Sequence, residues 1–395
     1  MITRRGPHIL TLVTLAGMSA LSINLFLPSL PGMARHFGVD YAVMQIAVSG
    51  YLAVSAVAQF VIGPISDRYG RRPVILAALA VFLLATLGAM LAETATAFLL
   101  FRMLQAVVAA LISLTRAVVR DMLPGPEAAS RIGYVTMGMA IAPMLAPMIG
   151  GALDEAFGWR AGVAFLFAVG LIAFAVAWID LSETATRGTG SFRTTLATYP
   201  ELLRSQRFWG YALAAALGSG GFFAYVGGAP FVGSAVFALS PTEIGMFFAC
   251  PALGYAIGNF ISGRYAARIG MNASVLLGGI LATLPMVAAL LADLAGLMHP
   301  AIFFPAVGVM ALGNGVLLPS ANSGAMSVRP ELAGSASGLA GMLAIGTGAA
   351  LSALAGALLG EGTGATPLVL LMLAASALSI PSILWVIRRE RQLAR

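Results

Sequence analysis

Arg102 lies inside an apolar stretch and is the first residue whose type and place could do chemistry. Arg102 follows the start of the apolar segment 97–120 by five residues, which puts it roughly 8 Å into a helix that begins there. Burying a charge in a lipid-covered helix is unfavourable by several kcal/mol unless the charge is paired or hydrated, so such a residue indicates a functional site. The alternative is that the long side chain extends to the membrane surface.

Uncharged polar residues occur in the same kind of segment and could contact a small molecule. Asn24 lies toward the end of the first apolar segment, at a depth comparable to Arg102 if successive segments alternate in direction, and Gln105 follows Arg102 by about one turn. Such side chains in a membrane either bind substrate or join neighbouring helices by hydrogen bonds. The predicted cavity residues are Asn24, Arg102, Gln105, Gln45, Tyr51, Tyr225, Asn259 and Asn314.

The residues that catalysis or metal binding would need are not grouped in this sequence. His8, His36 and His299 lie far apart, and the single cysteine, Cys250, stands in an apolar run, so no spacing typical of a zinc site occurs. No Ser/His or His/Asp/Glu constellation lies at a common depth, and no phosphate loop is present. We therefore expect no metal and no cofactor, and a membrane-embedded enzyme is a disfavoured alternative.

The composition places these residues in a lipid bilayer. Of 395 residues, 59% are hydrophobic and only 9% are charged, whereas soluble domains carry about 25% charged residues. A membrane-spanning helix needs about 20 apolar residues, and segments this long and continuous are helices rather than barrel strands. The predicted spans are 9–31, 42–66, 73–93, 97–120, 130–153, 160–181, 208–232, 242–264, 272–292, 300–326, 333–360 and 365–387.

The basic residues predict the orientation of these spans. All 22 are arginine; 20 of them lie between apolar segments rather than in one patch, and Arg102 and Arg116 lie inside the segment 97–120, so we expect no binding of nucleic acid. Eighteen of them fall in connections on one side of the membrane, and only Arg35 and Arg160 fall on the other. The positive-inside rule then puts both chain ends in the cytoplasm. We expect a multi-pass, monomeric membrane protein.

The chain divides into two halves around a polar stretch. This stretch, 182–207, is predicted to be a cytoplasmic linker between six-helix bundles at 1–181 and 208–395. Shifted by 196 residues, the segment 65–72 matches 261–268 at five of eight positions. Duplicated six-helix halves are typical of transporters that hold their substrate between the halves near the midplane. We therefore predict an all-α membrane protein of twelve helices in two pseudo-symmetric halves.

A charged loop after the second span carries a family resemblance. Its glycines, Asp67 and arginines resemble the GxxxDRxGRR signature of the major facilitator superfamily, in the expected place between helices 2 and 3. The resemblance implies that Asp67 faces the N-terminus of helix 11, where the helix dipole favours a carboxylate, and that one of the loop arginines pairs with Asp121. The alternative is ordinary charge at the membrane edge. The residues assigned to this gating loop are Gly63, Asp67, Arg68, Gly70, Arg71, Arg72 and Asp121.

The fifth span carries a second resemblance, to the antiporter signature of the same superfamily. Two of the signature's glycines are replaced here by Ala142 and Ala146, which are also small enough for close helix approach. Generic helix packing is the alternative interpretation. The residues assigned to this signature are Gly133, Pro143, Pro147, Gly150 and Gly151.

Further motifs resemble the bicyclomycin/chloramphenicol-resistance branch of drug:proton antiporters, among them Asn24–Pro31, Arg102–Gln105 and Glu183-Thr184. This likeness implies drug export from the bacterial cytoplasm across the inner membrane, driven by the proton gradient. The branch usually has Asp where this chain has Asn24, and no acidic residue lies near the centre of a predicted span, although a proton-coupled exchanger needs an embedded carboxylate. An importer, or a facilitator that does not use protons, is the alternative. An arginine without a central acid should also disfavour cationic substrates.

Overall fold

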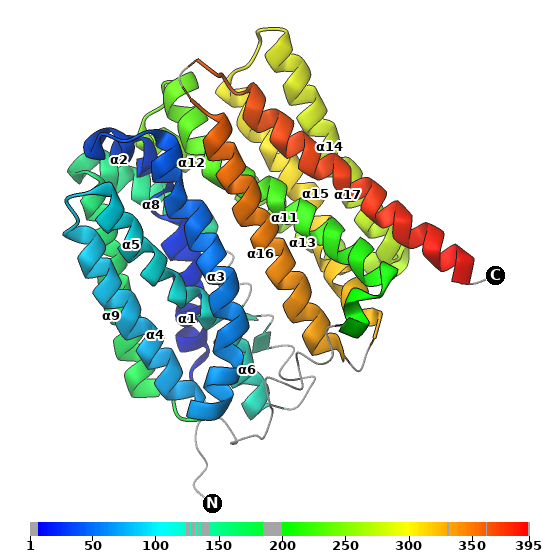
Figure 1. Cartoon of the computed structure of the whole chain (residues 1–395), viewed down its shortest axis with the longest axis horizontal. Helices are drawn as coiled ribbons and strands as arrows, with labels where there is room; N and C mark the ends of the chain where they lie inside the picture. The colour runs from blue at the N-terminus through cyan, green and yellow to red at the C-terminus, as the bar shows by residue number, and fades with distance from the viewer. Residues whose placement is uncertain are drawn as a thin grey trace, which may run out of the picture. The chain divides into compact units, whose positions relative to one another are not determined.

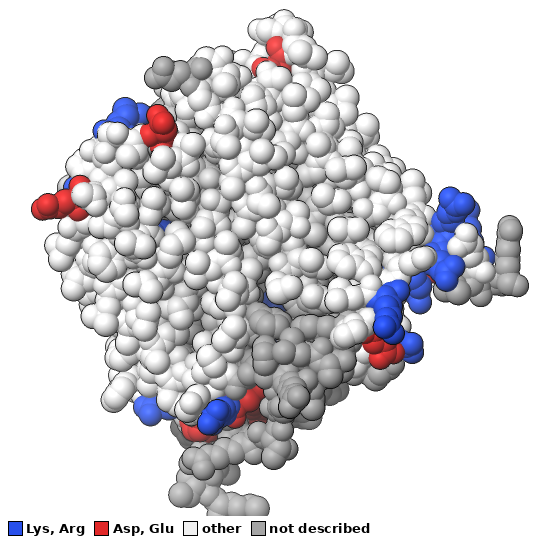
Figure 2. All heavy atoms as spheres, viewed as in Figure 1, with Lys and Arg blue, Asp and Glu red and all other residues white. Residues whose placement is uncertain are grey.

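Almost all of the chain described in the computed structural model is helical. The description covers residues 7–184 except 124–126, 128–130, 133, 136–138, 140 and 141, and residues 200–393 except 330, 331 and 361. Within these ranges no strand occurs, and eleven helices are long and apolar enough to cross a membrane. The face drawn in Figure 2 is almost free of charged side chains between the helix ends. The predicted all-α membrane fold is confirmed.

The helices begin and end within a few residues of most predicted spans (Figure 1). Those of the first half are α1 (Ile9–Asn24), η1 (Leu27–Ser29), α2 (Leu30–Phe37), α3 (Tyr41–Tyr69), α4 (Arg71–Met90), α5 (Ala95–Gln105), η2 (Ala106–Ala110), α6 (Leu111–Met122), α8 (Ala142–Phe157) and α9 (Trp159–Asp180). Those of the second half are α11 (Gln206–Phe231), η3 (Val232–Val236), α12 (Pro241–Phe247), α13 (Ala249–Ile269), α14 (Met271–Leu294), α15 (Pro300–Ser327), α16 (Ala333–Leu358) and α17 (Thr366–Leu393).

Three spans that the sequence predicts as continuous are interrupted, among them the eighth span, at Phe248 between α12 and α13. The first span breaks after Asn24, where Pro28 stands in the short 3₁₀ turn η1 before α2 resumes. The fourth span passes through the 3₁₀ segment η2 directly after Gln105, with no proline to cause it. The interruptions of the first and fourth spans lie beside Asn24 and Gln105, which are predicted to be functional. A 3₁₀ turn inside a long helix often marks a hinge or a strained segment.

The described chain forms two compact units. Unit 1 holds Met1–Asp40, Ala53–Phe192 and Pro241–Met246, and unit 2 holds Tyr41–Leu52, Arg193–Ser240 and Phe247–Arg395. The first three turns of α3 therefore belong to unit 2, and most of α12 belongs to unit 1.

Each unit has its own core of tightly packed helices. In unit 1, α1 packs against α6, α8 and α9, and α4 packs against α5 and α9. In unit 2, α11 packs against α15, α16 and α17, while α14 packs against α15 and α17. Glycines allow some of these approaches, because a Cβ on Gly254 or Gly258 of α13 would overlap a backbone carbonyl of α15. Such small-residue contacts are the usual means of helix association in membranes.

Two turn glycines correct the internal repeat. Gly70 joins α3 to α4 with φ 99° and ψ 153°, and Gly270 joins α13 to α14 with φ 89° and ψ 152°. These equivalent turns set the offset between the halves at 200 residues rather than 196. The sequence match at 196 is therefore wrong by four residues, which is about one helical turn. Residues four apart lie on the same helix face and have similar surroundings, so the same residue types can recur at an offset that is wrong by four.

Candidate functional site

Arg102 is held inside unit 1 by groups from α1. Its side chain is 1% exposed, so the interpretation that it extends to the membrane surface is wrong. Nη1 donates to Ser22 Oγ at 3.1 Å and to Gln105 Oε1 at 2.8 Å, and Nη2 donates to the Ser22 carbonyl at 2.7 Å. The guanidinium carbon also lies 4.0 Å from the centroid of the Phe26 ring, within cation–π range. Three of these contacts, those to Ser22 and Phe26, join the charge on α5 to the end of α1 and to the break that follows it.

Gln105 extends this arrangement to α4. Its Nε2 donates to Thr86 Oγ1 at 2.9 Å, and the Thr86 hydroxyl donates to the Phe82 carbonyl at 2.6 Å. A cavity of about 10 Å³ beside Arg102 and Gln105 has room for about one water molecule. Hydrogen bonds to charged groups contribute about 1.5–3 kcal/mol each. A movement of α1 relative to α5 would therefore require new partners for the guanidinium.

Asn24 is the last residue of α1 and stands in the sequence between Ser22 and Phe26, which both contact Arg102. Its side chain is 6% exposed, and its Nδ2 donates to the Ala20 carbonyl of the same helix at 2.7 Å. An ionised aspartate at this position would lose that bond, because a carboxylate only accepts. The predicted group of Asn24, Arg102 and Gln105 is thus gathered in one unit, on α1 and α5.

The predicted antiporter signature packs α8 against two other segments of unit 1. A Cβ on Gly150 would overlap the Leu25 carbonyl at the break in the first span, and a Cβ on Gly151 would overlap the Pro241 carbonyl of α12. In the same way, a Cβ on Gly245 of α12 would overlap the Pro147 carbonyl, so the approach is close from both sides. Pro143 lies at the start of α8, and Gly133 lies outside the described residues.

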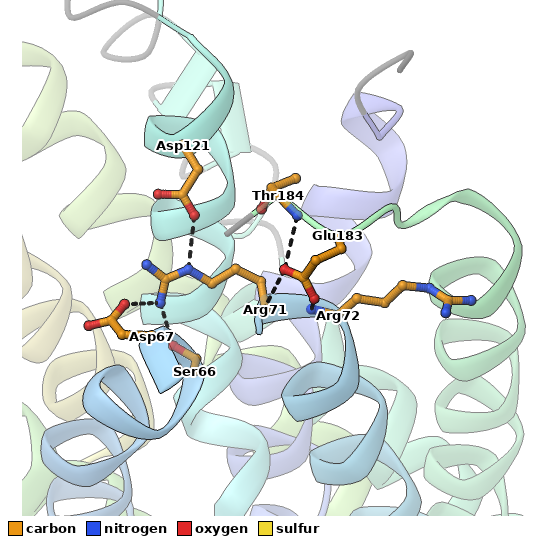
Figure 3. Close-up of polar contacts among 7 residues, drawn as sticks. All are labelled: Ser66, Asp67, Arg71, Arg72, Asp121, Glu183 and Thr184. Carbon is orange, nitrogen blue, oxygen red and sulfur yellow. Dashed lines mark hydrogen bonds and ion pairs between the residues drawn. The ribbon is translucent and has the colours of Figure 1, made fainter. Parts of the chain in front are cut away.

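The predicted gating loop forms an ion network around Arg71 (Figure 3). Its Nη1 lies 2.6 Å from Asp67 Oδ1 and its Nε lies 2.9 Å from Asp121 Oδ2. Nη1 also donates to the hydroxyl of Ser66. The predicted pairing with Asp121 is therefore made by Arg71, while Arg68 is exposed above the ring of Tyr69. The network ties the end of α3 and the end of α6 to the start of α4.

Glu183, to which the sequence assigns no role in this loop, binds the first turn of α4. Its carboxylate accepts from the backbone N–H of Arg71 at 2.8 Å and of Arg72 at 3.3 Å, where the free N–H groups and the helix dipole favour a negative charge. A Cβ on Gly70 would overlap this carboxylate. The Arg72 side chain turns away and donates to the Trp178 carbonyl at 3.0 Å. The sequence signals for Glu183 are its place directly after the sixth span and its part in the branch motif Glu183-Thr184, and neither predicts this contact with α4.

Gln45 anchors the start of α3 within unit 2. Its Nε2 donates to Ser352 Oγ of α16 at 2.7 Å, and the hydroxyl of Tyr41 donates to the Gly227 carbonyl of α11 at 2.6 Å. A Cβ on Gly227 or Gly356 would overlap the Gln45 side chain. Tyr41 and Ser352 were not predicted, because neither has a type or spacing that separates it from ordinary packing residues.

The other predicted cavity residues are distributed through unit 2. Tyr225 is fully buried among aromatic rings that include Phe248 and Phe303, Tyr51 is 1% exposed, and the Asn259 amide donates to a carbonyl of its own helix. Asn314, in the middle of α15, is 2% exposed, and neither its oxygen nor its nitrogen has a hydrogen-bond partner among the described residues. An unsatisfied buried amide destabilises a fold by about 1–3 kcal/mol. The role of these residues in a substrate cavity stays a prediction.

Comparisons with known proteins agree with this architecture. The model of the Major Facilitator Superfamily matches residues 12–344. The chain is 32% identical to Multidrug resistance protein D of Escherichia coli (strain K12) over 358 residues, covering 88% of each chain. It is 31% identical to the Uncharacterized MFS-type transporter YdgK of Bacillus subtilis (strain 168), covering 89% of this chain and 90% of that protein.

Another relative and a solved structure extend the comparison. The chain is 31% identical to a Chloramphenicol resistance protein of Pseudomonas aeruginosa, covering 66% of this chain and 62% of that protein. The peptide transporter POT in complex with alafosfalin has the same fold, with a TM-score of 0.80 at 13% identity over 98% of this chain and 96% of the other.

Proposed function

Because this chain belongs to the Major Facilitator Superfamily, we propose that it exports small amphipathic compounds from the bacterial cytoplasm by proton antiport and alternating access. The observation that carries the proposal is the desolvated guanidinium of Arg102, held between α1 and α5 beside a break in α1. A buried charge in a membrane span is a functional feature by default. The likeness to proteins named for multidrug and chloramphenicol resistance supports export of drugs.

The proposed orientation puts both chain ends and the linker 182–207 in the cytoplasm. The distribution of arginines supports it, since 18 of 22 lie in connections on one side. The network of Arg71, Asp67 and Asp121 then lies at the cytoplasmic face, where it joins the ends of α3 and α6 to the start of α4. We propose a monomer of two six-helix bundles, 1–181 and 208–395, in the inner membrane.

Proton coupling needs a group that changes its protonation during the cycle. Asp154, at the end of α8 and beyond the predicted span, is the described carboxylate that fits this need. Burial raises the pKa of Asp154, while the Ser29 hydroxyl and Arg35 lower it by smaller amounts, and Glu155 raises it further. Ser29 belongs to η1, so a change in the charge of Asp154 would act on the break in the first span. We propose Asp154 as the first residue to test for coupling.

Asn24 favours a second candidate function, a facilitator or importer that does not use protons. Its amide is bonded within α1 and provides no carboxylate near Arg102. An imposed pH gradient separates the two functions. Proteoliposomes loaded with radiolabelled chloramphenicol should accumulate or release it according to the gradient if the protein is an antiporter. Flux that ignores the gradient in wild type, but follows it in Asn24→Asp, would support the facilitator and identify position 24 as the coupling position.

A further inference from the structure

The last turns of α17 carry a basic face that no transport role explains. The helix continues to Leu393, beyond the predicted end at 387, so Arg388, Arg389 and Arg391 lie on regular helix. Leu384, Ile387, Arg388 and Arg391 follow one another at i, i+3, i+4 and i+7, the spacing of one helix face. Figure 2 shows basic side chains gathered at this end of α17.

This face of α17 and the start of α14 form a groove of about 550 Å³, here called the α14–α17 groove. Helices α14 and α17 pack side by side within unit 2 (Figure 1). Toward the membrane centre the groove is apolar, and toward the helix end it is polar and positively charged. Its lining consists of Leu276, Leu384, Ile387, Arg388, Arg391 and Gln392.

The two arginines of the groove lack a counter-charge. Neither Arg388 nor Arg391 forms an ion pair or hydrogen bond with any part of the chain that the structure describes. The carboxylate between them, Glu390, lies on the other face of α17. There it pairs with Arg207 Nη2 at 2.7 Å and accepts from Asn272 Nδ2 at 2.6 Å. The groove therefore carries two positive charges, and its neighbouring acid is neutralised elsewhere.

A second surface hollow shows what a neutralised site looks like. It has a volume of about 710 Å³ and is lined by residues that include Glu201, Arg207 and Arg329. Arg329 pairs with Glu201 at 3.1 Å and Arg207 pairs with Glu390, so most of its charge is balanced within the protein. Its lining also lacks the leucine and isoleucine side chains of the α14–α17 groove.

We propose that the α14–α17 groove binds an anionic phospholipid of the cytoplasmic leaflet. Arg388 and Arg391 would hold the phosphate by charge-assisted hydrogen bonds, and Leu276, Leu384 and Ile387 would contact an acyl chain. Leu384 and Arg391 are seven residues apart, or about 10 Å along the helix, which matches the passage from acyl chain to head group. The leaflet follows from the proposed orientation, whereas the site itself is independent of the transported substrate.

Native mass spectrometry of the purified full-length protein tests this site. The probes are phosphatidylglycerol, phosphatidylcholine and inorganic phosphate, added in detergent at equal concentrations. We compare wild type with Arg388→Gln/Arg391→Gln. The control Arg264→Gln/Arg268→Gln removes the same charge from exposed arginines of α13 that lie outside the groove. We expect one tightly bound phosphatidylglycerol in wild type and control, and binding about thirtyfold weaker in the groove variant.

Three results would overturn the proposal. Phosphatidylglycerol could bind the groove variant as tightly as the control variant, which would put the lipid elsewhere. Phosphatidylcholine could bind as well as phosphatidylglycerol, which would remove the role of the arginines in selecting an anion. Inorganic phosphate could displace phosphatidylglycerol at equal concentration, which would make the groove a site for free anions. This test measures lipid binding and not drug transport, so its outcome does not depend on whether the proposed function is correct.

Discussion

The turn between α3 and α4 in unit 1 and the turn between α13 and α14 in unit 2 share one backbone and differ in chemistry. Both pivot on a glycine with nearly the same φ and ψ, Gly70 and Gly270. At the offset of 200 residues, Ala267 stands in place of Asp67 and Met271 in place of Arg71. The first turn thus carries an ion network among its own residues, whereas the second turn lacks the counterparts of Asp67 and Arg71.

Each turn nevertheless has one carboxylate beside it, which comes from the end of the last helix of the same half. Glu183 accepts from the backbone of Arg71 and Arg72, and Glu390 accepts from the side chain of Asn272, the counterpart of Arg72. Tyr211 and Arg207 complete the second arrangement, because the Tyr211 hydroxyl donates to Asn272 Oδ1 at 2.6 Å. Both turns therefore combine a glycine with a nearby carboxylate, and the first turn adds the ions of the predicted gating loop.

The two glycines should show the largest difference. Alanine at either position is strained by the positive φ, by about 1–3 kcal/mol. At Gly70 the new Cβ would also overlap Glu183, whereas at Gly270 it meets open space. We expect Gly70→Ala to lose about 3 kcal/mol of stability and Gly270→Ala about 1 kcal/mol, measured by thermal unfolding in detergent. Equal losses would show that Glu183 does not hold α4 closely at this turn.

The central arginines should differ by a smaller amount. Arg71→Met leaves Asp67 and Asp121 without a shared cation, so we expect a loss of about 2 kcal/mol, since the guanidinium is largely buried. Arg207→Met leaves Glu390 bonded to Asn272, and we expect about 0.5–1 kcal/mol for this partly exposed pair. The measurement is thermal unfolding together with initial transport rates. A transport rate for Arg71→Met equal to that of Arg207→Met would remove the gating role of the first network.

The two carboxylates should behave alike if they serve the same turn geometry. Glu183→Gln and Glu390→Gln each keep one accepting oxygen and lose the charge, so we expect similar losses of about 0.5–1 kcal/mol. The comparison is made by thermal unfolding at low and high salt, because a charge effect weakens as salt rises. A loss confined to Glu183→Gln would show that the likeness between the turns ends at the backbone.

Asp154, outside both turns, should give the smallest effect and one that depends on pH. Burial raises the pKa of this carboxyl above its ordinary value of 3.8, so ionisation opposes the fold. Below pH 3.8 the group is protonated in both the folded and the unfolded state and has no effect. As pH rises through the raised pKa, wild type should lose stability relative to Asp154→Asn, and the difference should then level off. A difference that is constant with pH would contradict this assignment.

The sequence predicts much of this fold because apolarity determines which segments enter the bilayer, and it predicts the charged loop because glycine and arginine stand at the spacing that a turn requires. The break after Asn24 could not be located, since proline is tolerated in membrane helices. Which of Arg68, Arg71 and Arg72 pairs with Asp121 depends on helix rotation, which apolarity does not determine. Glu183 and Tyr41 were missed because their partners are backbone groups, which every residue carries.

The central claim is that the buried charge of Arg102, rather than its hydrogen bonds alone, is needed for transport. The direct measurement is drug flux driven by a pH gradient in proteoliposomes containing Arg102→Gln, which keeps donors but removes the charge. Arg264→Gln, at an exposed arginine of α13 outside every predicted site, is the matched control. We predict that Arg102→Gln falls to the flux of protein-free liposomes while Arg264→Gln retains most of the wild-type rate. Wild-type flux in Arg102→Gln would contradict the account.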